Sequence, residues 1–127
     1  MESLIIPGTQ ETPEVKFDSS NGKLSIIGRS YPSDTAAFYQ PISTWLNAYA
    51  LNPNSTIVLE IGIEYFHSVS VKFLTNIVKK LLALRSAEIS VSIVWYYEED
   101  DEDSIDLGKS IERDTKAAFT YIVLEEN

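Results

Sequence analysis

The fold is decided by residues 56–85, which read TIVLEIGIEYFHSVSVKFLTNIVKKLLALR. Apolar and polar positions alternate over residues 56–65, which is the period of a β-strand with one buried face. That face is expected to carry Ile57, Leu59, Ile61, Ile63 and Tyr65. From about Ser68 to Arg85 the apolar residues recur every three or four positions, which is typical of an amphipathic helix. Its core stripe is expected to consist of Val71, Leu74, Ile77, Val78, Leu81 and Leu84.

Two shorter strands are predicted upstream of this stretch. Residues 1–13 are rich in proline, glycine and threonine, which indicates an extended arm. Residues 14–18 and 23–29 have the composition of strands. The segment between them, Ser19-Ser20-Asn21-Gly22, predicts a hairpin turn because Asn-Gly readily adopts the left-handed conformation that such turns need.

A helix is predicted between these strands and residue 56. Asp34 or Ser33 is the expected N-cap, and a kink or a fresh helix start is expected near Gln40 because Pro41 lacks an N–H group. One face of this helix carries Phe38, Ile42, Trp45 and Tyr49. Downstream, the alternation over residues 89–97 predicts another strand. A weak helix from about Ser104 to Asp114 and a last strand near residues 118–124 complete the pattern.

The resulting element order is ββαβαβαβ, which predicts one α/β domain over residues 1–127 with a mixed, mostly parallel five-stranded sheet. Strands covered by helices on both faces are apolar throughout, whereas these strands alternate. The three helices are therefore expected mainly on one face of the sheet. The other face is expected to be open to water or to a partner and to carry Glu60, Glu64, Ser90, Ser92 and Tyr96.

Composition and charge exclude several classes of function. A hydrophobic fraction of 44% is enough for a core, and no cysteine is present to form a disulfide or a thiolate metal site. The formal net charge of −9 disfavours nucleic acids and anionic membranes, because both are bound mainly through basic side chains. The first residues do not read as a signal peptide, and no apolar run is long enough for a membrane helix. We therefore expect a cytoplasmic protein, a monomer or a weak dimer.

Catalytic and cofactor motifs are weak. His67 lies beside Ser68, but adjacent residues at a strand-to-helix bend rarely form a nucleophile–base pair, and no Gly-x-Ser-x-Gly surrounds Ser68. Glycine-rich nucleotide-binding motifs are absent as well, so no cofactor is expected. The acidic run 98–103 lacks the spacing of a calcium loop and predicts a solvated loop before a helix. An alternative reading is a small metal-dependent enzyme that uses His67 and this run, or a scaffold that does not switch.

Two hydroxyl groups stand where the strand becomes the helix. Ser68 and Ser70 both lie near a helix N-terminus, whose free N–H groups and partial positive charge accept an oxygen cap or a phosphate. Ser68 as an ordinary cap would stabilise the helix by about 1 kcal/mol. Phosphorylation would instead add about −1.5 to −2 charges close to Glu64 and repel a docked partner. The residues alone leave both readings open.

Several short motifs along the chain together resemble one known family. They are Ile6-Pro7-Gly8-Thr9, Thr12-Pro13, Gly28-x-Ser30-Tyr31-Pro32, Phe38-Tyr39, Trp45-Leu46, Tyr65-Phe66-x-Ser68-x-Ser70, and Trp95-Tyr96-Tyr97 followed by acidic residues. With these motifs the chain resembles, nearly end to end, the SiaC family of bacterial regulatory phosphoproteins, which is similar in fold to the STAS domains of anti-sigma-factor antagonists. The resemblance implies a STAS-like switch that is not an enzyme.

The resemblance also implies the partners. Family members are phosphorylated by a serine/threonine kinase and dephosphorylated by a PP2C-type phosphatase. Their unmodified form is implied to bind and activate a diguanylate cyclase, which raises cyclic di-GMP and favours biofilm formation.

The phospho-acceptor of the family is the threonine of a Tyr-x-Asn-Thr-Ser-Ser pattern, and Ser68 occupies that position here. Ser68 is therefore the expected acceptor and Ser70 the secondary one. His67 replaces the asparagine of the pattern, and Val69 replaces a serine. The docking surface is predicted to contain Tyr65, His67, Ser68, Val69 and Lys72.

Overall fold

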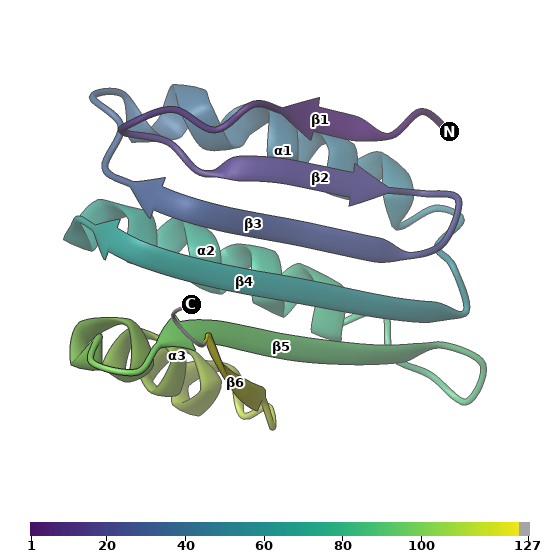
Figure 1. The fold of residues 1–127 in the computed structure, drawn as a ribbon. Coiled ribbons are helices and arrows are strands. Elements are labelled where there is room, and N and C mark those ends of the chain that lie inside the picture. Colours follow the sequence, from purple (N-terminus) through teal and green to yellow (C-terminus); the bar gives the residue numbers. More distant parts are fainter. Residues whose placement is uncertain (125–127) are drawn as a thin grey trace.

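A six-stranded β-sheet with three helices is the framework of the computed structural model, which describes residues 1–124 (Figure 1). The strands are β1 (Leu4–Ile6), β2 (Glu14–Asp18), β3 (Lys23–Ser30), β4 (Thr56–Phe66), β5 (Ser90–Glu98) and β6 (Thr120–Leu124). The helices are α1 (Thr35–Tyr49), α2 (Ser68–Leu82) and α3 (Glu102–Thr115). The strands lie side by side in the order of the sequence.

The sheet is mixed, as the sequence predicts. β1, β2 and β3 are antiparallel neighbours, whereas β3, β4, β5 and β6 are parallel neighbours joined by the helices. The expected number of five strands is wrong by one, because part of the arm over residues 1–13 adds an edge strand. Leu4 pairs with Phe17 and Ile6 with Val15. A strand of three residues is too short for an alternating pattern to reveal it.

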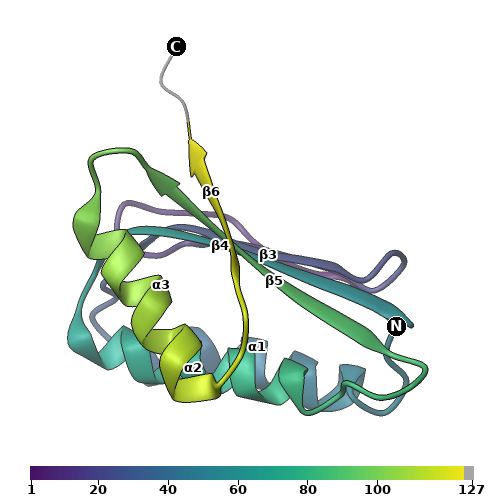
Figure 2. The same cartoon turned by 90° about the horizontal axis from the view of Figure 1, so that it is seen from below.

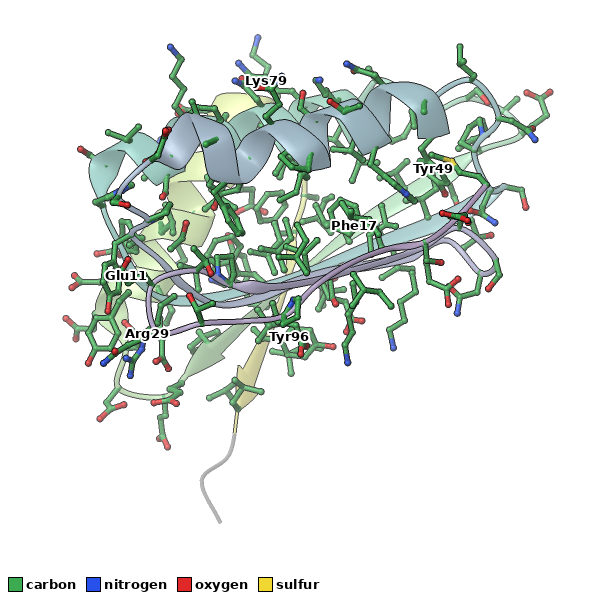
Figure 3. All side chains as sticks on the ribbon, turned by 90° about the horizontal axis from the view of Figure 1, so that it is seen from above. Glu11, Phe17, Arg29, Tyr49, Lys79 and Tyr96 are labelled. Atoms are coloured by element: carbon green, nitrogen blue, oxygen red, sulfur yellow. The ribbon has the colours of Figure 1, made fainter. Side chains whose placement is uncertain are left out.

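The three helices lie on one face of the sheet, which confirms the arrangement expected from the alternating strands (Figure 2). Phe17 lies between the sheet and the helices, whereas Arg29 and Tyr96 lie on the opposite side of the sheet (Figure 3). The inward residues of β4 from Ile57 to Ile63 are at most 1% exposed. Burial of each such aliphatic side chain contributes about 1.5–3 kcal/mol, so this face stabilises the helical layer.

The last residues of strand β4 depart from the expected alternation. The alternation predicts Tyr65 on the same face as Ile63, but its side chain is 60% exposed. The pairing of β3 with β4 shifts between Gly28 and Ser30, so that Ser30 pairs with Phe66. Phe66 packs against the core, and the guanidinium of Arg29 lies 5.0 Å from the centre of the Tyr65 ring. The irregular register thus releases Tyr65 to the surface at the edge where α2 begins.

The helices differ from the sequence prediction mainly at their ends. α1 is capped by Asp34 as expected, but it runs without interruption through Pro41, whose side chain is exposed. α2 ends at Leu82 rather than near Arg85, and α3 begins at Glu102 because Asp101 caps it. In the described part of the chain no helix combines the length and the apolar character that crossing a membrane requires.

The predicted hairpin turn is confirmed between β2 and β3. Gly22 has a φ of 74°, a left-handed conformation that suits glycine. A Cβ atom at this position would lie 2.1 Å from the carbonyl oxygen of Thr56. The backbone of the turn therefore approaches the start of β4 so closely that only glycine fits.

Candidate functional site

The strand-to-helix junction lies at the edge of the sheet where the parallel strands β3 and β4 end (Figure 1). The backbone N–H of His67 donates to the carbonyl of Ser30 at 3.2 Å, which joins the ends of the two strands. The carboxyl edge of a parallel sheet is where α/β proteins usually place their ligands. The fold thus presents the first turn of α2 at a position that suits recognition.

His67, and not Ser68, is the N-cap of α2. The imidazole Nδ1 accepts a hydrogen bond from the backbone N–H of Ser70 at 3.2 Å. The Nε2 atom lies 3.2 Å from the carbonyl oxygen of Pro32, which can only accept a hydrogen bond. Nδ1 is therefore the accepting nitrogen of the ring, and Nε2 is the nitrogen that donates. The interpretation of Ser68 as an ordinary cap is wrong, because the helix begins at Ser68 itself, one residue earlier than a Ser68 cap requires.

Ser68 is the first residue of α2 and its side chain is exposed. Within residues 1–124, the backbone N–H groups of Ser68 and Val69 have no hydrogen-bond acceptor. Such free N–H groups and the helix dipole favour negative charge at this end of the helix. A phosphate on the Ser68 hydroxyl would therefore meet a favourable backbone environment and no steric barrier from burial.

Ser70 is fully buried, with an exposed fraction of 0%. Its hydroxyl donates to the carbonyl oxygen of Ser30 at 2.9 Å and accepts from the Ser30 hydroxyl at 2.8 Å. The Ser30 hydroxyl in turn lies 2.6 Å from the Tyr39 hydroxyl on α1. Burial raises the pKa of Tyr39, so this phenol remains neutral and able to donate. The Ser70 hydroxyl is thus part of a closed internal network.

The remaining residues of the predicted docking surface surround this end of α2. Tyr65, Val69 and Lys72 are exposed, while His67 is half-buried and its ring nitrogens are engaged. The Nε atom of Arg29 donates to Glu64 Oε1 at 2.8 Å, and the same guanidinium lies over the Tyr65 ring. The unmodified surface therefore combines an aromatic ring, a valine and a hydroxyl, with Lys72 at its margin, which forms no salt bridge in the described part of the chain.

The acidic run 98–103 is accounted for by its place in the fold. Glu98 ends β5, and the Asp101 carboxylate accepts the backbone N–H of Ser104 at 3.0 Å to cap α3. Glu102 and Asp103 lie in the first turn of α3, where acidic residues favour the helix dipole. Over residues 1–124 no three histidine or carboxylate side chains come close enough together to hold a metal ion. The run and His67 do not form a common site.

Three residues of the internal network, Ser30, Thr35 and Tyr39, were not predicted from the sequence. The Thr35 hydroxyl lies 3.2 Å from His67 Nε2, and the other two hydroxyls connect Ser70 to α1. One signal for Ser30 was present, since it continues the inward positions Leu24 and Ile26 of its strand. The contacts to α1 depend on how the helix is rotated, which the sequence pattern does not define.

Known proteins share this fold and sequence along nearly the whole chain. The sequence model of the SiaC family regulatory phosphoproteins matches residues 6–124. A curated, uncharacterized protein of Pseudomonas aeruginosa strain UCBPP-PA14 is 27% identical over 126 residues, which are 99% of this chain and 100% of that protein. The crystal structure of apo-SiaC from Pseudomonas aeruginosa is 26% identical with a TM-score of 0.82, over 98% of this chain and 100% of that one.

A further solved structure contains a partner. It is the crystal structure of the diguanylate cyclase SiaD in complex with its activator SiaC from Pseudomonas aeruginosa. The matched chain is 26% identical, with a TM-score of 0.82 over 94% of this chain and 97% of that one.

Proposed function

The chain belongs to the SiaC family of regulatory phosphoproteins, and we propose that it is a binding switch whose unmodified form docks on and activates a diguanylate cyclase. The observation that carries the proposal is the exposed hydroxyl of Ser68 on the first residue of α2. The complex of the relative SiaC with the cyclase SiaD, which it activates, supports a cyclase as the target. Tyr65, His67, Ser68, Val69 and Lys72 form the proposed docking surface.

The choice of Ser68 over Ser70 rests on accessibility. A kinase must reach the hydroxyl, and the Ser68 side chain is exposed while Ser70 is fully buried. Phosphorylation of Ser70 would also break its hydrogen bonds to Ser30 and leave buried polar groups without partners, at a cost of about 1–3 kcal/mol for each group. Ser68 can be modified without any change in the core.

The proposed effect of the phosphate is electrostatic. It brings about −1.5 to −2 charges to a surface that is otherwise neutral at Tyr65 and Val69. The free N–H groups at the start of α2 stabilise the phosphate within this protein, so the fold persists. Lys72 lies four residues after Ser68, the spacing at which opposite charges pair along a helix. The phosphate would therefore occupy Lys72 and remove a cation that a docked partner could use.

The switch needs two further partners, a serine/threonine kinase and a PP2C-type phosphatase, and it involves no catalytic step of its own. Kinase action consumes ATP, which places the proposed pathway in the cytoplasm. The exposed position of Ser68 beside a helix terminus also suits the return reaction, because a phosphatase can approach the phosphate from solvent.

The proposal is tested by phosphorylation in vitro with site mapping. The protein is incubated with ATP and the serine/threonine kinase proposed as its partner, and the modified residue is identified by mass spectrometry. We expect one phosphate on Ser68, no incorporation in Ser68→Ala, and full incorporation in the matched variant Ser43→Ala on α1. Absence of phosphate from Ser68 in the unaltered protein would contradict the proposed switch.

A further inference from the structure

Positive charge is concentrated on α2 and the residues that follow it. Residues 65–87 contain four basic residues and no acidic residue, although the whole chain has a formal net charge of −9. The basic residues are Lys72, Lys79, Lys80 and Arg85. α1, which lies beside α2, contains no charged residue at all (Figure 1). The surface formed by α1 and α2 is therefore cationic on an acidic protein.

These cations are not compensated within the described chain. The salt bridges of residues 1–124 join Lys16 to Glu14, Lys23 to Glu60 and Arg29 to Glu64, and all of them lie on strands. Lys80 instead donates to neutral oxygens across the helix pair, at 2.7 Å to Ser43 Oγ and 2.9 Å to Asn47 Oδ1. Lys79 points away from the sheet (Figure 3). A carboxylate of a partner could therefore pair with the ammonium groups of Lys79 and Lys80 without displacing a salt bridge within residues 1–124.

A groove of about 570 Å³ runs between α1 and α2 on this surface. Its α1 side is formed by small or neutral residues, among them Ala36, Gln40 and Ser43. Its floor includes Phe73 and Tyr39, whose rings stack with centroids 5.2 Å apart. Its α2 side ends in Lys79 and Lys80. The groove is thus apolar at the bottom, uncharged on one side and cationic on the other.

We propose that this groove binds an acidic amphipathic helix of a partner protein. Small residues between two neighbouring helices allow a third helix to approach closely, and an apolar floor accepts its apolar stripe. Carboxylates at one flank of that helix would pair with Lys79 and Lys80. This inference rests on the proposed function, because it assumes that the protein acts by docking on a partner. It adds that the docking segment of the partner is an acidic amphipathic helix.

The test uses a synthetic probe, a helix-stabilised peptide of about 20 residues with leucine and alanine on one face and glutamate on the other. Binding to the ¹⁵N-labelled protein is followed by amide chemical shifts and by titration at low and at high salt. We expect shifts at Gln40, Ser43 and Asn76, and an affinity that falls with salt. Charge reversal in Lys79→Glu/Lys80→Glu should weaken binding about tenfold or more.

Two further variants make the test specific. Lys109→Glu/Arg113→Glu reverses two exposed cations on α3 and should change the affinity little. Gln40→Trp fills the groove from an exposed position without altering its charge and should also weaken binding.

Several results would overturn the inference. They are shifts on the open sheet face only, equal losses in the α2 and α3 variants, absence of peptide binding, or a dimer that dissociates in Lys79→Glu/Lys80→Glu. The last of these would assign the groove to a second copy of the chain. Because the probe is a peptide, its failure is distinguishable from a failure of cyclase binding, which is measured separately with the intact cyclase.

Discussion

Ser68 and Ser70 are only two residues apart but lie in different environments. The Ser68 hydroxyl faces solvent, while Ser70 lies at 0% exposure within a network that reaches Ser30 and Tyr39. The sequence predicts two hydroxyls at the junction but not which of them points inward. That depends on the residue at which α2 begins, since one residue rotates the helix by about 100°. The cap at His67 sets this phase and thereby exposes Ser68.

The cap leads to a prediction about stability. His67→Ala removes the side-chain acceptor for the backbone N–H of Ser70 and leaves only the His67 carbonyl at 3.1 Å, and we expect the free energy of unfolding to fall by about 0.5–2 kcal/mol. His67→Asn, which places another good cap residue at this position, should retain most of that stability. Urea denaturation followed by circular dichroism measures both variants. An asparagine variant as unstable as the alanine variant would show that the cap is not the reason for the loss.

At the scale of elements, α3 is held against β5 by close packing at a glycine. A Cβ atom built on Gly108 would lie 2.8 Å from Cδ2 of Trp95, whose side chain is fully buried. The Trp95 indole N–H also donates to Ser104 Oγ of α3 at 3.2 Å. The helix can therefore lie this close to the strand only because residue 108 has no side chain.

Gly108→Ala is accordingly expected to lower the free energy of unfolding by about 1–3 kcal/mol, because Trp95 or α3 must move to admit the methyl group. We expect this loss even though alanine stabilises a helix by about 1 kcal/mol relative to glycine. Lys109→Ala, at an exposed neighbouring position, is the control and should be nearly neutral. Thermal unfolding of the two variants checks the prediction, and a stabilised Gly108→Ala would contradict the packing argument.

The regular elements were predictable because their patterns are long. The alternation over β4 and β5 and the stripe on α2 gave the parallel sheet and the single layer of helices. β1 was missed because three residues carry no period, and Tyr65 was misplaced because the shift in the β3–β4 register has no sequence signal. At the site, the exposure of Lys72 followed from the helix pattern, whereas the exposure of Ser68 depended on the start of α2 and the hydroxyl network on the packing of α1.

At the scale of the whole molecule, tyrosine ionisation links stability to alkaline pH. Burial, followed by a hydrogen bond to Glu112, raises the pKa of Tyr121, whose hydroxyl lies 2.9 Å from Glu112 Oε1. A hydrogen bond to Glu60 raises the pKa of Tyr96 on the open sheet face, and burial raises the pKa of Tyr39. In each case the folded state favours the neutral phenol.

Because these pKa values are raised on folding, their contribution to stability is complete below about pH 10, the pKa of an unfolded tyrosine, and is lost as the pH rises further. We expect the urea midpoint to fall steeply above that pH. In Tyr121→Phe the fall should be shallower, although the variant starts from a lower stability because it lacks the bond to Glu112. Equal slopes for both proteins would contradict this role of Tyr121.

The two faces of the molecule also differ in charge. The open sheet face holds paired charges, including Lys23 with Glu60 and Arg29 with Glu64, whereas the helical face presents lysines on α2 that form no salt bridge within residues 1–124. Ser68 stands at the end of this helical face. A phosphate there changes the charge of the region that the proposed partner contacts and leaves the core untouched.

The central claim is tested most directly by the affinity of the cognate diguanylate cyclase for the unmodified and the Ser68-phosphorylated protein, measured by calorimetric titration. We predict tight binding of the unmodified form and of Ser68→Ala. Binding should be at least about tenfold weaker for the phosphorylated form, since loss of about 1.4 kcal/mol suffices for that factor. Equal affinities for the two forms would contradict a docking surface controlled by the charge at Ser68.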